Sequence, residues 1–360
     1  MSPDELWMSR ALELAEKGRY SVSPNPMVGC LIVRGGEVLG EGFHRRAGEP
    51  HAEALALATA QEAAGATVYV TLEPCAHEGR TPACADALVA AGVAKVVVAT
   101  IDPSPHTNGG GIERLLDAGI EVSVGVLEDE ARRLNESFLF SVRHGRPFVV
   151  VKAGMTLDGK LATASRQSQW ITSEEARNRS LLLREEYDAI LVGSGTIKSD
   201  DPKLSRRSGL NESIIPWTRV VVDADGDIPL ESQILTDEQP TLLFTVDPVV
   251  YASATMTEAV YAATAEGKID LERVLRDLAE REIRSVIVEG GSLVISDILK
   301  RGLWQKLILF VAPMMVGGAE SPSIFNDSSI DELTEALRFR FDRIEKVGPD
   351  VMLVAYPTRD

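Results

Sequence analysis

Three side chains that can bind zinc and one carboxylate lie close together in the first quarter of the chain. Glu53 follows His51 by two residues, and Cys75 and Cys84 come after them. A neutral imidazole and two thiolates suit zinc, and three protein ligands leave the fourth position open to water. A carboxylate beside such a site can carry protons. Together these groups could replace an amino group on a heteroaromatic ring with oxygen from water.

The interval between the two cysteines leaves more than one interpretation open. Deaminases usually carry the pattern Pro-Cys-x-x-Cys, whereas eight residues separate Cys75 from Cys84 here. The insertion indicates either an inactive site or a particular subfamily. A structural zinc protein is a further alternative, but a closed structural site has no use for Glu53. We expect Cys30, in an apolar segment, to lie in the core.

The elements expected around these residues place them at one end of a sheet. We predict a helix over residues 51–63, a buried strand over 67–71 and a helix over 83–91. A single charged helix is expected from about 128 to 142. Residues 143–147 (RHGRP) form a basic, Gly/Pro-marked break. We therefore expect two α/β domains, residues 1–145 and 146–360.

Composition restricts the partners and the compartment. The net charge is −17, and the acidic residues are spread over both halves. Because a polyanion binder usually carries a basic face, nucleic acid is not expected as a substrate. The longest apolar stretches are too short to cross a membrane. The number of cysteines is odd, two of them lie in a metal motif that needs reduced thiols, and an apolar signal segment is lacking at the N-terminus. These features predict a cytoplasmic protein.

Four motifs in the first half extend the pattern. They are residues 25–30 (NPMVGC), 48–53 (GEPHAE), 71–77 (TLEPCAH) and 79–82 (GRTP). These motifs resemble those of bifunctional riboflavin-biosynthesis deaminase/reductases, in which the longer cysteine interval is typical. The resemblance implies a cytidine-deaminase-like three-layer α/β/α domain, zinc on His51, Cys75 and Cys84, and Glu53 as proton shuttle. The implied substrate, 2,5-diamino-6-(5-phosphoribosylamino)pyrimidin-4-one, loses its ring 2-amino group as ammonia.

The second half resembles the reductase half of the same family. The matching residues are Lys152, 157–160 (LDGK), 168–173 (SQWITS), 200–204 (DDPKL) and 289–291 (EGG). This half is similar to dihydrofolate reductase, and it implies NADPH-dependent reduction of the ribosyl group to ribityl. Lys152 is expected to polarise the sugar oxygen or imine; its alternative is a solvated lysine at a strand end.

The same resemblance assigns contacts in the second domain. The implied cofactor site contains Gly154, Trp170, Thr196, Asp200, Gly290 and Gly291. The implied substrate contacts are Ser168, Arg184, Leu204, Arg207 and Glu289. Two guanidinium groups could clamp a phosphate, and Arg206 competes with Arg207 for that role. The family also suggests a homo-oligomer.

Two departures from the family pattern bear on the sites. In residues 224–229 (ADGDIP), Ala224 and Asp227 stand where the family usually carries Ser and a basic residue. Asp225 and Asp227 make this loop acidic, so NADH is the alternative to NADPH, which we expect. In the first domain, Ser104 replaces an Asn of residues 102–105, so this loop is expected to be held differently.

The nearest rival enzyme is a nucleoside or tRNA deaminase with an unrelated C-terminal domain. The even acidity and the reductase motifs argue against it. We expect a small-molecule substrate, no nucleic acid and no membrane.

Overall fold

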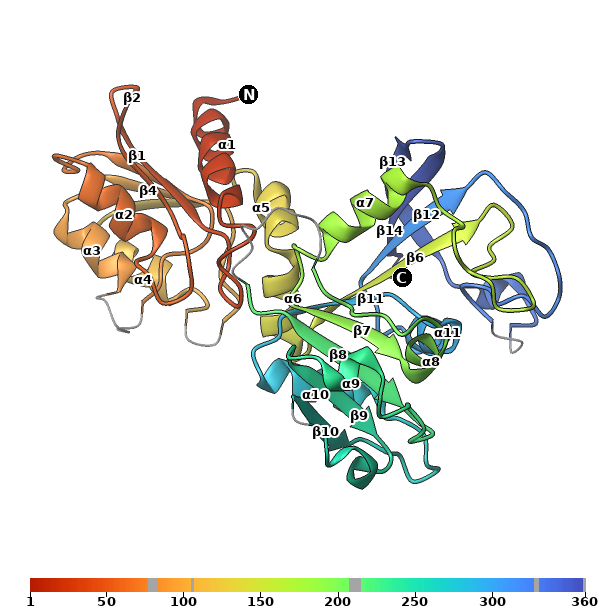
Figure 1. The fold of residues 1–360 in the computed structure, drawn as a ribbon. Helices are drawn as coiled ribbons and strands as arrows, with labels where there is room; N and C mark the ends of the chain where they lie inside the picture. Colours follow the sequence, from red (N-terminus) through yellow and green to blue (C-terminus); the bar gives the residue numbers. More distant parts are fainter. Residues whose placement is uncertain (77–82, 105–106, 207–214, 255, 327–329, 359–360) are drawn as a thin grey trace. The chain divides into compact units, whose positions relative to one another are not determined.

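The computed structural model describes residues 1–76, 83–104, 107–206, 215–254, 256–326 and 330–358 (Figure 1). The chain separates into two compact units, with the break between Gly145 and Arg146. We call Met1–Gly145 unit 1 and the segment that begins at Arg146 unit 2.

Unit 1 is built on a five-stranded sheet in the order β2-β1-β3-β4-β5. Strands β2 and β3 run antiparallel to β1, whereas β3, β4 and β5 are parallel. Because parallel strands end at the same edge, the loops after β3 and β4 are neighbours. The strands are β1 (Gly29–Arg34), β2 (Glu37–Phe43), β3 (Thr67–Val70), β4 (Lys95–Val98) and β5 (Glu121–Val124).

Helices cover both faces of this sheet (Figure 1). They are α1 (Pro3–Glu16), α2 (Ala52–Thr59), α3 (Cys84–Ala90), α4 (Gly110–Asp117) and α5 (Glu128–Leu134), and α6 (Glu136–His144) follows α5. Since successive strand side chains point to opposite faces, Cys30 and Ile32 pack with α2, α3 and α4, whereas Leu31 and Val33 pack with α1 and α5. The expected three-layer α/β/α arrangement and the core position of Cys30 are confirmed.

The prediction of one helix over residues 128–142 was wrong. The helix breaks at Asn135, between α5 and α6. The buried amide of Asn135 accepts the N–H of Met27 at 2.8 Å and donates to the carbonyl of Met27 at 2.8 Å. This long-range pairing, which periodicity does not reveal, fixes the loop before β1.

Unit 2 contains a nine-stranded sheet in the order β10-β9-β8-β7-β11-β6-β12-β14-β13. Neighbouring strands from β10 to β12 are parallel, and β14 and β13 complete one edge as an antiparallel hairpin. The strands are β6 (Phe148–Thr156), β7 (Ala189–Gly193), β8 (Thr218–Asp223), β9 (Thr241–Thr245), β10 (Thr257–Tyr261), β11 (Ser285–Val288), β12 (Lys306–Ala312), β13 (Phe339–Val347) and β14 (Asp350–Pro357).

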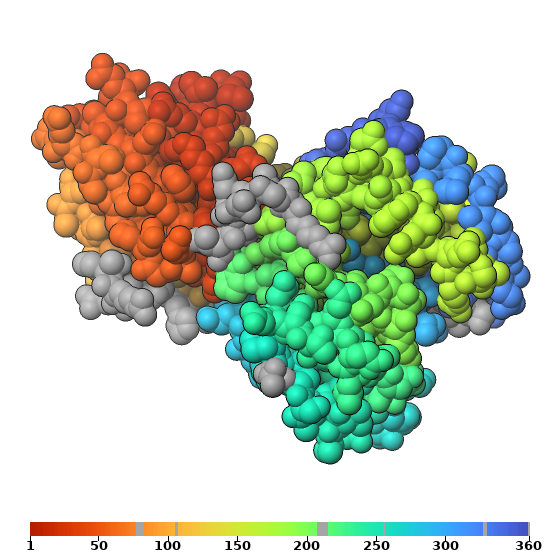
Figure 2. Space-filling view, in the orientation of Figure 1, coloured from red at the N-terminus to blue at the C-terminus, as the bar shows by residue number. Residues whose placement is uncertain are grey.

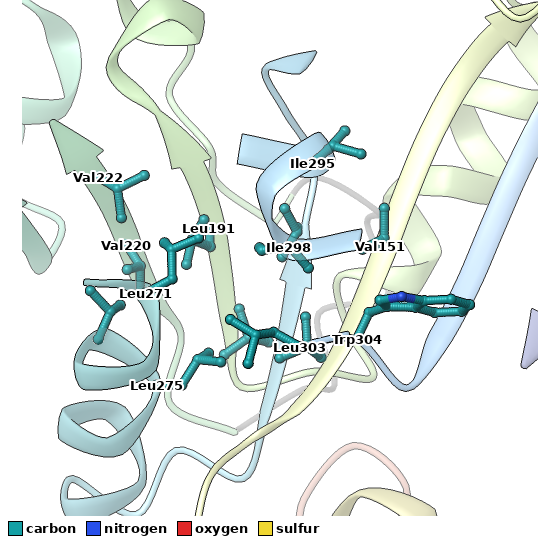
Figure 3. Close-up of a cluster of buried hydrophobic side chains, with 14 of the residues drawn as sticks. Val151, Leu191, Val220, Val222, Leu271, Leu275, Ile295, Ile298, Leu303 and Trp304 are labelled. Atoms are coloured by element: carbon teal, nitrogen blue, oxygen red, sulfur yellow. The ribbon is translucent and has the colours of Figure 1, made fainter. Parts of the chain in front are cut away.

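The helices of unit 2 include two that seal its main core. Leu271 and Leu275 of α10 and Ile295 and Ile298 of α11 pack against central strands such as β7 (Figure 3). The helices are α7 (Glu174–Leu183), α8 (Ser194–Asp200), α9 (Gln233–Thr236), α10 (Leu271–Glu280) and α11 (Ser292–Lys300), with 3₁₀ turns η1 (Pro248–Tyr251) and η2 (Leu333–Glu335). Among the described residues, no helix has the length and hydropathy to cross a membrane.

Sequence patterns missed the hairpin of β13 and β14. Most residues of β13 are exposed, including Phe339, Phe341 and Ile344, so the strand lacks the alternating burial that marks a half-buried strand. The hairpin is the last part of unit 2 and is dark blue in the space-filling view (Figure 2).

Candidate functional site

The structure brings His51, Cys75 and Cys84 together although three different elements carry them. His51 is the N-cap of α2, Cys75 follows β3, and Cys84 opens α3. Their ligand atoms all lie within 4.8 Å of one another. His51 Nδ1 lies 3.3 Å from Cys84 Sγ and 3.6 Å from Cys75 Sγ. Two sulfur atoms and one imidazole nitrogen at this spacing fit a zinc ion with one position left over.

The longer cysteine interval does not separate the two thiols. The N–H of Cys84 donates to Cys75 Sγ at 3.3 Å, and the N–H of Ala85 donates to the carbonyl of Cys75 at 3.1 Å. Residues 77–82 of the insertion lie outside the described residues. A side-chain hydrogen bond between the two thiols, together with His51, lowers the pKa of Cys75 to about 4, while the same side-chain bond and burial raise the pKa of Cys84. Cys75 is therefore the readier thiolate.

Glu53 lies in the first turn of α2, and its side chain is only 3% exposed. Burial raises the pKa of Glu53 to about 7. A carboxyl group in a dry site beside the three ligand residues has the placement required of a proton carrier.

A second histidine supports the segment before the metal ligands. His44 is buried, and its Nδ1 lies 3.2 Å from the carbonyl of Pro50, so Nδ1 carries the proton and donates. Its Nε2 then accepts from Asn25 Nδ2 at 3.0 Å. Burial lowers the pKa of His44, in agreement with a neutral ring. This arrangement turns the carbonyl oxygen of the Asn25 side chain away from His44.

In unit 2, three of the predicted residues meet at the carboxyl end of β11, which lies between β7 and β6. Lys152 lies in β6, Glu289 follows β11, and Arg184 caps the end of α7. Arg184 holds Glu289 through two parallel hydrogen bonds of 2.7 and 2.8 Å, and Lys152 Nζ lies 3.4 Å from Glu289 Oε2. Ligands of open parallel sheets bind at this edge.

The three charges hold one another in a nearly buried site. The side chains of Lys152, Arg184 and Glu289 are 15%, 13% and 10% exposed. Burial raises the pKa of Glu289, but the charges of Lys152 and Arg184 outweigh burial and lower it to about 2. Glu289 is therefore ionised at neutral pH, and Lys152 is not a solvated lysine at a strand end.

The glycines of the expected cofactor site face threonines. A Cβ on Gly290, whose φ is +156°, would lie 3.1 Å from Thr196 Oγ1, and one on Gly291 would lie 3.4 Å from the same atom. A Cβ on Gly154 would lie 3.0 Å from Thr172 Cγ2. Threonine side chains therefore already occupy the space beside these three glycines, and a larger residue at any of them would press against its threonine neighbour.

The remaining predicted residues differ in exposure. Trp170 is 67% exposed, with the Arg177 guanidinium 4.3 Å from its ring centroid. Ser168 is half-buried in the same loop. Asp200 is exposed at the end of α8, one turn beyond Thr196. The Leu204 side chain is buried, and its carbonyl accepts from Trp217 Nε1 at 2.9 Å.

Of the two arginines that could bind the substrate phosphate, only Arg206 is among the described residues. Arg206 donates to the carbonyls of Arg184 and Tyr187 at 2.9 and 2.7 Å and stacks on Trp217, so it fastens the end of α7. Arg207 lies outside the described residues.

The acidic loop after β8 has a cationic neighbour that sequence reasoning missed. Lys198 of α8 donates to both carboxylate oxygens of Asp227 at 2.7 and 2.9 Å and lies 4.0 Å from Asp225. Only spatial proximity identifies this pair, because Lys198 and Asp227 are 29 positions apart in the sequence. The loop is thus less acidic than its sequence indicates.

Comparisons with known proteins agree with both sites. Residues 1–100 match the cytidine and deoxycytidylate deaminase zinc-binding region, and residues 147–353 match the RibD C-terminal domain. The chain is 42% identical to the riboflavin biosynthesis protein RibD of Aquifex aeolicus over 97% of each chain. It is also 42% identical to the Escherichia coli protein of that name, over 97% of this chain and 98% of that one.

Solved structures are similar over the full length. Acinetobacter baumannii RibD superposes with a TM-score of 0.89 at 39% identity and 99% coverage of both chains. A diaminohydroxyphosphoribosylaminopyrimidine deaminase/5-amino-6-(5-phosphoribosylamino)uracil reductase from Thermotoga maritima gives 0.86 at 35% identity, again over 99% of both.

Proposed function

The chain belongs to the RibD family of bifunctional riboflavin-biosynthesis enzymes, and we propose from this premise which of its residues carry the two reactions. It is a zinc-dependent deaminase fused to an NADPH-dependent reductase. The alternative of a nucleoside or tRNA deaminase with an unrelated C-terminal domain is wrong, because the RibD C-terminal match covers residues 147–353. We assign deamination to unit 1 and reduction to unit 2.

The first reaction hydrolyses the 2-amino group of 2,5-diamino-6-(5-phosphoribosylamino)pyrimidin-4-one. Water supplies the oxygen, and ammonia and 5-amino-6-(5-phosphoribosylamino)uracil leave. The second reaction transfers a hydride from NADPH to C1 of the ribosyl group, which becomes ribityl. The substrate is therefore a small molecule.

The cluster of His51, Cys75 and Cys84 beside buried Glu53 is the observation that carries the deaminase assignment. The two sulfur atoms and one nitrogen would hold zinc, which when bound makes water a nucleophile at neutral pH. Glu53 would take one proton from the attacking water and deliver it to the ring nitrogen, and would then carry the second proton of that water to the leaving amine, which departs as ammonia. Its burial supports this role, since proton transfer is most effective when water is excluded.

The ion group of Lys152, Glu289 and Arg184 supports the reductase assignment. Hydride addition at C1 leaves negative charge on the attached oxygen or nitrogen, and Lys152 is the cation we assign to stabilise it. Glu289 would hold the Lys152 side chain in place. NADPH supplies the hydride when bound, and the glycines Gly154, Gly290 and Gly291 would line its site.

We assign the remaining predicted residues by the same premise. Trp170, Thr196 and Asp200 would line the cofactor, and Ser168, Leu204 and Arg207 would contact the substrate. Arg184 would contact the substrate phosphate through N–H groups not engaged by Glu289.

A homo-oligomer and a cytoplasmic location are also proposed. The exposed apolar side chains of edge strand β13 support self-association, since monomers seldom leave such an edge uncovered. Analytical ultracentrifugation tests this, and a monomer at micromolar concentration would contradict it.

Paired product measurements test the function. The diamino substrate is added to zinc-loaded protein, and ammonia and NADPH consumption are followed in one tube. We expect equimolar amounts. Ammonia without NADPH consumption would contradict the reductase assignment.

Glu53→Gln tests the proton carrier. We expect zinc content to remain and ammonia release to fall by about 10²–10⁴-fold, because the amide cannot carry the proton. Reduction of the deaminated intermediate should persist. Glu62→Gln, at an exposed carboxylate, is the control. Unchanged deamination in Glu53→Gln would exclude the assigned role.

A further inference from the structure

Glu73 is a buried acidic residue that neither reaction uses. It lies between β3 and the metal ligand Cys75, and its side chain is only 4% exposed. Its backbone N–H donates to the carbonyl of Thr100 at 3.0 Å, just beyond β4. The residue therefore connects the ends of two adjacent parallel strands.

The carboxylate of Glu73 accepts four backbone hydrogen bonds. Oε2 accepts from Asp102 at 3.3 Å and from Gly109 at 3.0 Å. Oε1 accepts from Gly111 at 3.0 Å and from Ile112 at 3.3 Å. An ionised carboxylate only accepts, so it suits four converging N–H groups, whereas an amide would point donors at donors.

The first turn of α4 lies directly against the metal-ligand loop. A Cβ on Gly111 would come 1.9 Å from the carbonyl oxygen of Pro74, so only glycine permits this contact. On the other side, α3 binds Cys75 through the N–H of Ala85. Cys75 is thus held between two helices, and Glu73 provides the polar connection to α4.

We propose that Glu73 is a positioning residue that fixes the Cys75 thiolate for zinc by fastening its loop to the first turn of α4. The inference rests on the proposed function, in which Cys75 binds zinc. Groups that orient metal ligands without touching the metal commonly change metal affinity by 10- to 100-fold.

The hydrogen bonds of Glu73 also explain how the loop is held with Ser104 at the position where the family usually has Asn. The N–H of Ser104 donates to the Asp102 carboxylate at 2.8 Å, and the N–H of Asp102 donates to Glu73. These bonds use backbone donors, so they do not depend on the side chain at position 104.

Glu73→Gln is the first test. We expect zinc affinity, measured by competition with a chromophoric chelator, to fall 10- to 100-fold. The visible absorption of the cobalt(II)-loaded protein should also change in wavelength or intensity, because its thiolate ligand moves. Glu113→Gln removes an exposed carboxylate from the first turn of the same helix and should leave both unchanged. Equal affinity and spectra in the two variants would overturn the proposal.

A second measurement uses the unaltered protein, so it holds even where Glu73→Gln fails to fold. If Glu73 couples Cys75 to α4, zinc must in turn stabilise that turn. Removing zinc should then accelerate hydrogen exchange at the amides of Gly109, Gly111 and Ile112, and leave α10 unaffected. Identical exchange with and without zinc would overturn the proposal.

The outcomes separate the two hypotheses. A wild-type chain that binds no zinc overturns both. Zinc binding and deamination by the wild type, with Glu73→Gln equal to Glu113→Gln, overturn only the positioning role.

Discussion

At the scale of single residues, burial decides which charged groups can do chemistry. Glu53, Glu73 and Glu289 are all nearly inaccessible to water, yet their surroundings differ. Glu53 lies beside the metal ligands, Glu73 accepts four N–H groups, and Glu289 is flanked by two cations. One residue type thus provides the proposed proton carrier, the proposed positioning residue and a counter-ion.

The Glu289 carboxylate gives a pH prediction. Its pKa is about 2 in the fold against an ordinary value of 4.5, so its ionisation stabilises the fold above pH 4.5. This contribution is lost as pH falls from 4.5 through 2. We therefore expect the stability advantage of wild type over Glu289→Gln to shrink by about 2 kcal/mol between pH 6 and pH 3.

Urea unfolding of both proteins at the two pH values, followed by unit 2 fluorescence, measures this difference. Glu231→Gln, at an exposed position, is the matched control. An advantage that is equal at pH 6 and pH 3 would contradict the ion group.

At the scale of elements, Tyr251 anchors both ends of the loop after β8 without using the side chains of Asp225 and Asp227. Tyr251 donates to Asp223 at 2.5 Å at the start of the loop and accepts from the N–H of Ile228 at 3.0 Å at its end. Changes at Asp227 should therefore alter charge rather than loop shape. The remaining question is whether Lys198, paired with Asp227, is available to a 2′-phosphate.

Asp227→Asn should raise the preference for NADPH over NADH. Removing the carboxylate frees Lys198 from its exposed ion pair with Asp227, and such a pair contributes at most about 1 kcal/mol. We therefore expect the ratio of kcat/KM with NADPH to kcat/KM with NADH to rise by roughly two- to fivefold. Asp227→Arg should act in the same direction and more strongly. Steady-state kinetics with both cofactors measure the ratio, with Glu231→Gln as control. An unchanged ratio would mean that this loop does not contact the 2′-phosphate.

At the scale of the whole molecule, the units have separate cores. The main buried cluster of unit 2 contains residues from Val149 to Ala355 only, and those of unit 1 contain residues up to Ala131. Each site is also built from one unit. The two reactions should therefore respond separately to loss of a cofactor.

Zinc removal tests that independence. Dialysis against a chelator should abolish ammonia release, because His51, Cys75 and Cys84 lose their ion. Reduction of the deaminated intermediate by NADPH should continue. Restoring zinc should restore deamination. Parallel loss of both activities on chelation would contradict separate sites.

Local features of the chain were enough to predict the deaminase chemistry and most of the helices and strands. Residue types and spacing indicated the zinc ligands and Glu53, and short continuous apolar runs predicted buried strands such as β3, β7 and β11. These features are local, since a strand or helix face is encoded within a few neighbouring residues.

Contacts between residues far apart in the sequence became visible only in the folded chain. The break at Asn135 depends on Met27, the charge of the acidic loop on Lys198, and the loop at Ser104 on Glu73. Arg184 and Glu289, 105 residues apart, form a bidentate pair for the same reason. The periodicity of apolar residues cannot predict such contacts. They form because the order of the strands in a sheet brings distant parts of the chain together.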